Sequence, residues 1–229
     1  WIAAFSEGLA ADQRTYGIAL YGGDTTGTPG PMTLSLTAFG KVAGQAVLDR
    51  GSVRPGDDFY VSGTIGDAWL GLRVLRGDLE ALDTANRAAL VQRYRLPEPR
   101  MALGRALLEE GVARSALDVS DGLVADLRHL LEASGVGAEI ALDAVPVSAA
   151  SQAALSLLGA PRQALLGGGD DYELLFAAAP AQREAVAALS GRLGLPIARI
   201  GRARAESGLV LRDAAGSDVP LESGGWTHF

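Results

Sequence analysis

The sequence of 229 residues contains no cysteine and only two histidines, His129 and His228. A chain without thiols cannot form disulfide bonds, cannot bind zinc through thiolates and cannot use a cysteine nucleophile. Two histidines so far apart in the sequence also make a histidine-based zinc site a poor expectation. The absence of cysteine fits a reducing compartment, and we expect a cytoplasmic protein.

Long hydrophobic runs and an excess of positive charge are missing as well. No stretch approaches 18 consecutive apolar residues, and the first residues lack the basic-then-apolar pattern of a signal peptide, so we expect no membrane association. Lysine and arginine number 20 against 27 acidic residues, a formal net charge of −7. A chain this acidic is generally repelled by phosphate backbones, so we expect no nucleic-acid partner. An anionic ligand would bind to this chain only with the help of a metal cation.

The composition, 48% hydrophobic and 21% charged, is that of a folded globular protein with a sizeable core. Hydrophobic periodicity predicts an α/β (α+β) fold. Helices are expected over residues 2–15, 67–76, 84–95, 99–110, 122–134, 147–158 and 181–193. Strands are expected over residues 32–42, 59–61, 116–119, 137–142, 172–178, 197–202 and 208–212.

Two domains are expected, with a boundary near residue 52. The sequence Arg54-Pro55-Gly56-Asp57 is typical of a turn before a strand, so residues 1–52 and 53–229 are assigned to separate domains. The chain begins at Trp1 inside a predicted helix, with no methionine or capping residue before it. We therefore expect the amino-terminal domain to be truncated.

Three loops combine glycine with acidic residues: Gly22-Gly23-Asp24-Thr25-Thr26, Asp118-Val119-Ser120-Asp121-Gly122, and Gly167-Gly168-Gly169-Asp170-Asp171-Tyr172-Glu173. Clustered carboxylates repel one another and lose hydration energy, so such groups are stable mainly beside a cation. Mg²⁺ prefers oxygen ligands and commonly combines carboxylates with substrate phosphates. A magnesium and phosphate site is therefore the leading hypothesis.

Each loop also has a simpler interpretation. Gly22-Gly23-Asp24 is compatible with a turn in which the aspartate bonds its own backbone. Ser120 or Asp121 is suited to cap the helix that follows, and in that helix Asp126 is expected to face away from the apolar side. The three glycines at 167–169 are compatible with a flexible connection as well as with close approach to a ligand.

Arg50 is suited either to hold a phosphate through its planar guanidinium or to form a surface ion pair. Among the common nucleophile and nucleotide motifs, Gly-x-Ser-x-Gly, His-Glu-x-x-His and the Walker sequence are all missing. What remains is a metal-assisted phosphate site without an evident protein base. This suits phosphoryl transfer, in which positioning and charge neutralisation do most of the work.

The three acidic loops, the Arg54-Pro55-Gly56-Asp57 turn and the ending Gly225-Trp226-Thr227-His228-Phe229 together resemble the thiamine-monophosphate kinase family, of the aminoimidazole ribonucleotide synthetase-like superfamily. The resemblance implies a two-domain α/β fold and ATP-dependent phosphorylation of thiamine monophosphate to thiamine diphosphate, on several Mg²⁺ ions in a homodimer. It is collinear over nearly the whole chain.

The resemblance also implies roles for single residues. Asp24, Asp118 and Asp121 would be Mg²⁺ ligands. Gly23, Asp24, Arg50 and Ser120 would contact ATP, and Asp170 and Trp226 would contact thiamine monophosphate. Asp171 and Glu173 are supporting residues, for which structural and binding roles stay open.

The chain also departs from the family. A Gly-Asp-Asp cluster and a further aspartate that family members carry ahead of the region of Trp1 are missing, and Gly27-Thr28 stands where a basic residue is common. A fragment that binds nucleotide or thiamine phosphate without turnover, and a sister ATP-dependent synthetase, are therefore the alternative functions.

Overall fold

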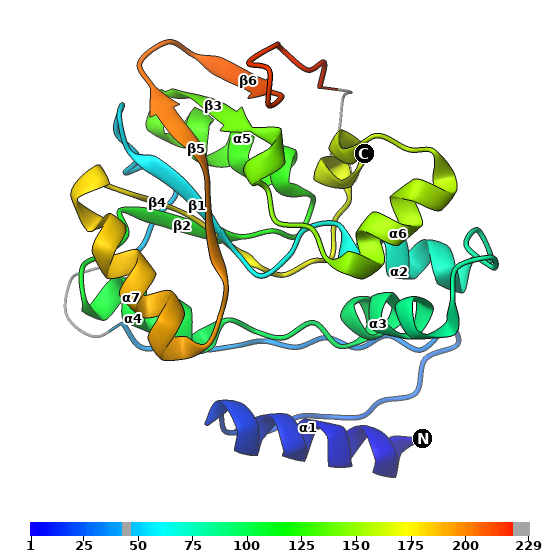
Figure 1. The fold of residues 1–229 in the computed structure, drawn as a ribbon. Helices are drawn as coiled ribbons and strands as arrows, with labels where there is room; N and C mark the ends of the chain where they lie inside the picture. The colour runs from blue at the N-terminus through cyan, green and yellow to red at the C-terminus, as the bar shows by residue number, and fades with distance from the viewer. Residues whose placement is uncertain (43–46, 222–229) are drawn as a thin grey trace. The chain divides into compact units, whose positions relative to one another are not determined.

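The computed structural model describes residues 1–42 and 47–221, which form two compact units, Trp1–Gln45 and Ala46–Phe229. Figure 1 shows the elements of each unit along the chain. The predicted Trp226 contact and the carboxy-terminal motif lie outside the described residues. The expected boundary near residue 52 stays a prediction.

The described residues of the first unit, 1–42, contain one helix, α1 (Ile2–Tyr16), as its amphipathic pattern predicts. It ends at Gly17 in a left-handed conformation (φ 64°), a common way for a helix to stop. None of its side chains is buried.

The strand expected over residues 32–42 is wrong, because residues 18–42 contain no strand. Its alternating residues Met32, Leu34 and Leu36 are 64%, 59% and 80% exposed. A strand needs hydrogen bonds to a neighbour, and no described strand pairs with this segment.

The second unit is built on one six-stranded sheet in the order β2-β4-β1-β5-β3-β6. The strands are β1 (Asp58–Ser62), β2 (Ser115–Asp118), β3 (Gly137–Ala141), β4 (Leu174–Ala178), β5 (Ile197–Arg204) and β6 (Gly208–Arg212). All neighbours are antiparallel except the parallel pair β3 and β6. The mixed α/β class predicted from the sequence is confirmed.

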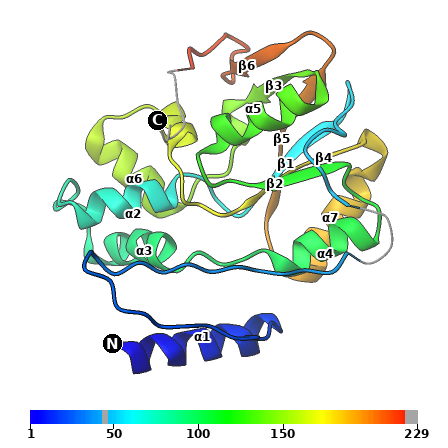
Figure 2. The ribbon, with the colours of Figure 1, turned by 180° about the vertical axis from the view of Figure 1, so that it is seen from behind.

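The described part of the second unit also contains six α-helices (Figures 1 and 2). They are α2 (Asp67–Leu75), α3 (Thr84–Arg95), α4 (Met101–Glu109), α5 (Leu123–Ser134), α6 (Ala149–Leu158) and α7 (Arg183–Leu193). Short 3-10 turns lie at Leu142–Ala144, Arg162–Gly167 and Pro180–Gln182. The helices expected in this part of the chain are confirmed, with ends that differ by at most two residues.

The central strand β1 is buried on both faces, which explains its lack of polar alternation. Phe59 and Val61 pack in the cluster that contains the apolar side of α5, whereas Tyr60 packs with Phe176 and with α4 and α7 on the other face. A third apolar cluster joins α2, α3 and α6, around Leu70 and other residues.

Candidate functional site

The acidic loop of residues 118–122, called here the first acidic loop of the second unit, connects the end of β2 to the start of α5. Asp118 is the last residue of β2 and is exposed, and Gly122, at φ 115°, is the residue before α5. Gly122, and not Ser120 or Asp121, occupies the N-cap position of α5, so the alternative in which one of those two residues is the N-cap is not observed. The amides of the first turn of α5 consequently lie beside this loop, where they favour negatively charged ligands.

Asp126 organises this loop from inside the first two turns of α5. Its Oδ2 accepts hydrogen bonds from the backbone N–H groups of Ser120 (2.9 Å) and Asp121 (3.0 Å). Asp126 is only 2% exposed, so the expectation that it faces away from the buried side is wrong. The helical period predicted a polar face, but the carboxylate turns inward because it accepts hydrogen bonds from two loop amides.

The acidic loop of residues 167–173 is the second acidic loop of this unit. It runs beside the first acidic loop and extends the pairing of β2 with β4. The N–H of Asp170 donates to the carbonyl of Ser120 (2.9 Å), and the N–H of Tyr172 donates to the carbonyl of Val119 (2.8 Å). The N–H of Val119 donates in turn to the carbonyl of Glu173 (2.8 Å). Two of the three predicted acidic loops, and with them Asp118, Ser120, Asp121 and Asp170, therefore share one edge of the sheet.

Glycine makes this close approach possible. A Cβ at Gly169 would lie 2.4 Å from the carbonyl oxygen of Ser120, and one at Gly122 would lie 2.9 Å from the carbonyl carbon of Gly167. Both distances are shorter than real Cβ contacts, so no larger residue fits without a shift of the backbone. The glycine-rich segment is thus a packed junction between two loops and not a flexible connection.

The two loops concentrate negative charge in one place. Burial raises the pKa of the Asp126 carboxyl, and the neighbouring charges of Asp121 and Asp118 add to the rise, although two backbone amides oppose it. Burial also raises the pKa of the Tyr172 phenol, with contributions from Asp170, Asp118 and Asp121. Mutual repulsion of this kind is relieved when a cation binds between the carboxylates.

A cation would find oxygen ligands here. Within residues 1–42 and 47–221, the one group of three acidic or histidine side chains close enough for a shared ion is Asp121, Asp126 and His129, with ligand atoms within 4.8 Å of one another. His129 is exposed. The carboxylates fit Mg²⁺, which prefers oxygen donors.

The buried side of the second loop is formed by Asp171 and Glu173. The Asp171 carboxylate accepts hydrogen bonds from the N–H groups of Gly66 (2.7 Å) and Ala68 (3.1 Å) at the start of α2. Burial raises its pKa to about 7 against the effect of these donors. Asp171 is therefore a structural neighbour of the exposed acidic cluster and not a member of it.

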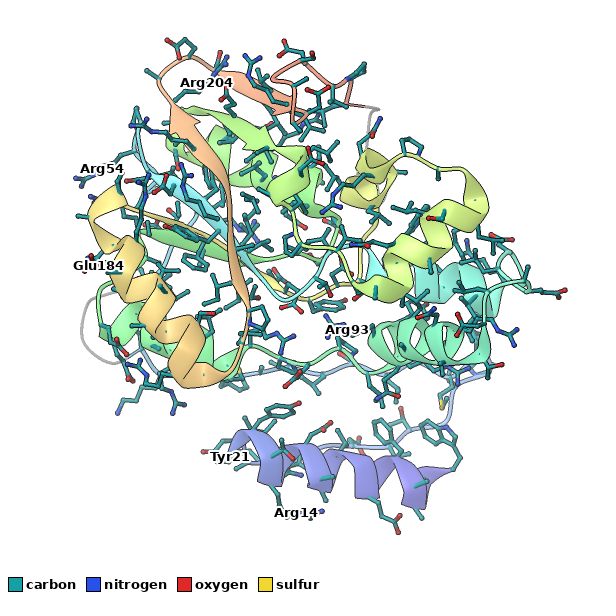
Figure 3. All side chains as sticks on the ribbon, in the orientation of Figure 1. Arg14, Tyr21, Arg54, Arg93, Glu184 and Arg204 are labelled. Carbon is teal, nitrogen blue, oxygen red and sulfur yellow. The ribbon has the colours of Figure 1, made fainter. Side chains whose placement is uncertain are left out.

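Glu173 forms an ion-pair network that the sequence analysis missed. Its carboxylate accepts from Arg93 Nη2 (2.6 Å), from Arg100 Nε and Nη2 (both 2.7 Å) and from Ser62 Oγ (2.6 Å). Arg93, labelled in Figure 3, comes from the last turn of α3. Burial opposes the charge of Glu173, but these donors hold its pKa below the usual value. A sequence signal exists in the arginines Arg93, Arg95 and Arg100, which lie close to Pro97 and Pro99.

The remaining described residues of the predicted site, Gly23, Asp24 and Arg50, are exposed. Gly23 and Asp24 are exposed in the first unit, where Asp24 Oδ1 accepts from the N–H of Thr25 (2.8 Å), as expected for a turn. Arg50 is exposed in the second unit and makes no salt bridge with any residue that the structure describes. Its carbonyl accepts from Ser134 Oγ (3.1 Å), so its backbone lies at the opposite end of α5 from Asp121.

Comparison with known proteins identifies the class of domain that carries this site. Residues 54–214 match the family model described as AIR synthase related protein, C-terminal domain. This match covers the sheet and both acidic loops of the second unit.

Relatives over the whole chain narrow the class further. The chain is 39% identical to a thiamine-monophosphate kinase of Salmonella typhimurium over 231 residues, which is 100% of this chain and 69% of that protein. It therefore belongs to the thiamine-monophosphate kinase family.

Solved structures of thiamine-monophosphate kinases have a fold similar to that of this chain. The thiamine-monophosphate kinase of Stenotrophomonas maltophilia K279a is 38% identical, with a TM-score of 0.63 over 75% of this chain and 54% of that chain. AaThiL complexed with AMPPCP and TMP is 33% identical, with a TM-score of 0.66 over 80% of this chain and 54% of that chain. The chain thus spans about half the length of these solved proteins. Among the described helices, none has the length and apolar character needed to cross a membrane.

Proposed function

We propose that the protein catalyses the ATP- and Mg²⁺-dependent phosphorylation of thiamine monophosphate to thiamine diphosphate by direct transfer. The observation that carries this proposal is the meeting of Asp118, Asp121 and Asp170 at one sheet edge, in a chain of the thiamine-monophosphate kinase family. The complex of AaThiL with AMPPCP and TMP supports the choice of substrates.

In the proposed reaction, a phosphate oxygen of thiamine monophosphate attacks the γ-phosphorus of ATP. The bond from the γ-phosphorus to the bridging β-γ oxygen breaks, and ADP leaves. Mg²⁺, when bound, neutralises the charge on the phosphates. No protein base is needed, because an ionised phosphate oxygen is already a nucleophile.

The residues of this chain would bind and orient the reactants. Asp118 and Asp121 would hold Mg²⁺, and Ser120 would contact ATP through its hydroxyl. Asp24 is proposed as a further Mg²⁺ ligand. Gly23 and Arg50 would contact other parts of ATP. Asp170 and Trp226 would hold the thiamine part, since a cationic thiazolium is attracted both to a carboxylate and to an aromatic face. We propose a cytoplasmic homodimer. The exposed apolar side chains of residues 32–42, such as Met32, Leu34 and Leu36, support a partner subunit that covers this segment.

Replacement of Asp121 by Asn in the full chain tests the metal assignment. We expect Mg²⁺-dependent turnover of thiamine monophosphate to fall by at least about a hundredfold, because each site charge contributes several kcal/mol to a phosphoryl-transfer transition state. The melting temperature should change little, since Asp121 lies on a half-exposed loop. Asp143→Asn, a change at an exposed carboxylate of the 3-10 turn after β3, is the matched control and should keep full activity. Unchanged turnover in Asp121→Asn would remove Asp121 from the metal site.

A second candidate is binding without turnover by the 229 residues alone. The share of the solved relatives that the chain spans, 54%, favours this candidate. Calorimetry with AMPPCP and Mg²⁺, beside a kinase assay on the same chain, separates the two. Binding without product formation identifies a binding module, whereas formation of thiamine diphosphate identifies the kinase.

A further inference from the structure

The loop of residues 168–173 presents its side chains alternately to the outside and to the interior. Asp170 and Tyr172 face outward, with Tyr172 41% exposed, whereas Asp171 and Glu173 are 1% and 0% exposed. Asp170 and Tyr172 also share an unusual backbone conformation. Their φ angles are 70° and 50°, and they are the only described non-glycine residues with positive φ.

Positive φ is unfavourable for residues with a Cβ, most of all for a bulky aromatic one. Such conformations persist only when surrounding contacts determine them, and they gather at functional sites. The contacts that hold Asp170 and Tyr172 in this conformation therefore decide where the outward side chains lie.

Asp171 lies between these two residues and makes contacts that suit this purpose. Both carboxylate oxygens are used: Oδ2 accepts from Gly66 N–H (2.7 Å) and Oδ1 accepts from Ala68 N–H (3.1 Å). A carboxylate held through both oxygens has one orientation. The backbone on each side is then held by the N–H groups of Asp170 and Tyr172, which bond to the first acidic loop.

We infer that Asp171 is a positioning residue, which ties the acidic loop to the start of α2 and so directs Asp170 and Tyr172 toward the substrate. The inference rests on the proposed function for its kinetic part. Glu173 holds the end of the loop independently, through two arginines and Ser62. Loss of the Asp171 contacts should therefore reorient the middle of the loop without unfolding the sheet.

The test compares Asp171→Asn with Asp58→Asn in the full chain. Asp58 is a matched control because it is equally buried and also has two partners, Arg183 and Arg199, but pairs with Ala178 at the opposite end of β4. We expect Asp171→Asn to raise the KM for thiamine monophosphate at least about tenfold and to leave the KM for ATP within about twofold, because Asp170 and not the ATP-binding residues is displaced. Asp58→Asn should lower the melting temperature without changing either KM.

Amide hydrogen exchange measured by NMR gives a second readout that needs no kinase activity. In the wild type, the amides of Asp170 and Tyr172 should exchange as slowly as those of β4, and in Asp171→Asn they should exchange at least about tenfold faster while β4 keeps its protection. Fast exchange of these two amides in the wild type would overturn the inference even if the variant does not fold.

Other outcomes are equally decisive. An unchanged KM for thiamine monophosphate in a folded Asp171→Asn protein would show that Asp171 only stabilises the fold. The same rise in KM in Asp58→Asn would assign the effect to general destabilisation. If the wild type does not phosphorylate thiamine monophosphate, the proposed function fails, and the exchange rates still decide whether Asp171 positions the loop.

Discussion

Glu173 gives the sharpest test of what holds the candidate site in place. Its carboxylate is fully buried and binds Arg93 and Arg100, while Arg100 also binds Glu98, whose side chain is 70% exposed. One arginine thus has a buried and an exposed carboxylate partner at similar distances, 2.7 and 2.8 Å. The pair Glu173→Ala and Glu98→Ala compares the two environments directly.

The expected losses in the free energy of unfolding differ several-fold between Glu173→Ala and Glu98→Ala. Removal of one member of a buried ion pair costs about 3–5 kcal/mol, because the remaining charge is left without a partner. The side chains of Arg93 and Arg100 keep 22% and 10% exposure, so water can solvate them in part and we expect the lower value, about 3 kcal/mol. Glu98→Ala removes a surface pair and should cost less than about 1 kcal/mol.

Urea unfolding followed by circular dichroism measures both effects. With a slope of about 2 kcal/mol/M, the midpoint should shift by roughly 1.5 M for Glu173→Ala and by less than about 0.5 M for Glu98→Ala. A double-mutant cycle with Arg100→Ala isolates the pair from other lost contacts. Equal shifts for the two glutamates, or a loss below about 1 kcal/mol for Glu173→Ala, would refute the argument that burial decides the energy.

Three further predictions concern the loops and the pH dependence. Gly122→Ala should lower the free energy of unfolding by at least about 2 kcal/mol more than Gly135→Ala, because both have positive φ but only Gly122 has backbone in the way; equal losses in urea titrations would contradict this. Burial raises the pKa of Asp171 to about 7, so the folded state keeps a proton that the unfolded chain releases near pH 4, and this carboxyl makes the free energy of unfolding fall between about pH 4 and 7. Asp171→Asn should flatten that fall in urea titrations at several pH values, and an unaltered slope would refute the assignment. For Asp58, burial opposes the charge but its two arginines hold the pKa below the usual value, so its stabilisation is present above about pH 4 and is lost in acid; Asp58→Asn should therefore weaken the acid sensitivity of the midpoint, and an identical acid profile would count against it.

Much of the second unit could be predicted because its sequence patterns are local. The helix at α5 follows from the apolar period of Leu123, Leu127 and Leu130, and the short strands follow from apolar runs bounded by glycine, proline and aspartate. The alternation over residues 32–42 had the same appearance, but no described strand provides hydrogen-bond partners for it. A local pattern indicates that a segment is suited to a strand, whereas the partner strand is a property of the whole fold.

The candidate site was predictable in its residue types but not in its internal contacts. Clustered carboxylates beside glycines indicated a cation and phosphate site, and the structure places two of the three loops together. The inward turn of Asp126 and the pairing of Glu173 with Arg93 depend on contacts across 5 to 80 residues, which periodicity does not contain. The strand expected to begin at residue 172 begins at Leu174, because Tyr172 adopts a left-handed backbone.

The order of the sheet has a consequence for synthesis of the protein. The central strand β1 is made early, but its neighbours β4 and β5 follow more than a hundred residues later, since Phe59 pairs with Ala177 and Gly201. At about 5–20 residues per second, a ribosome needs roughly 6–24 s to deliver the first of them. During that interval the fully buried strand β1 of the nascent chain has no partner strand, and we expect holdase chaperones to bind it there.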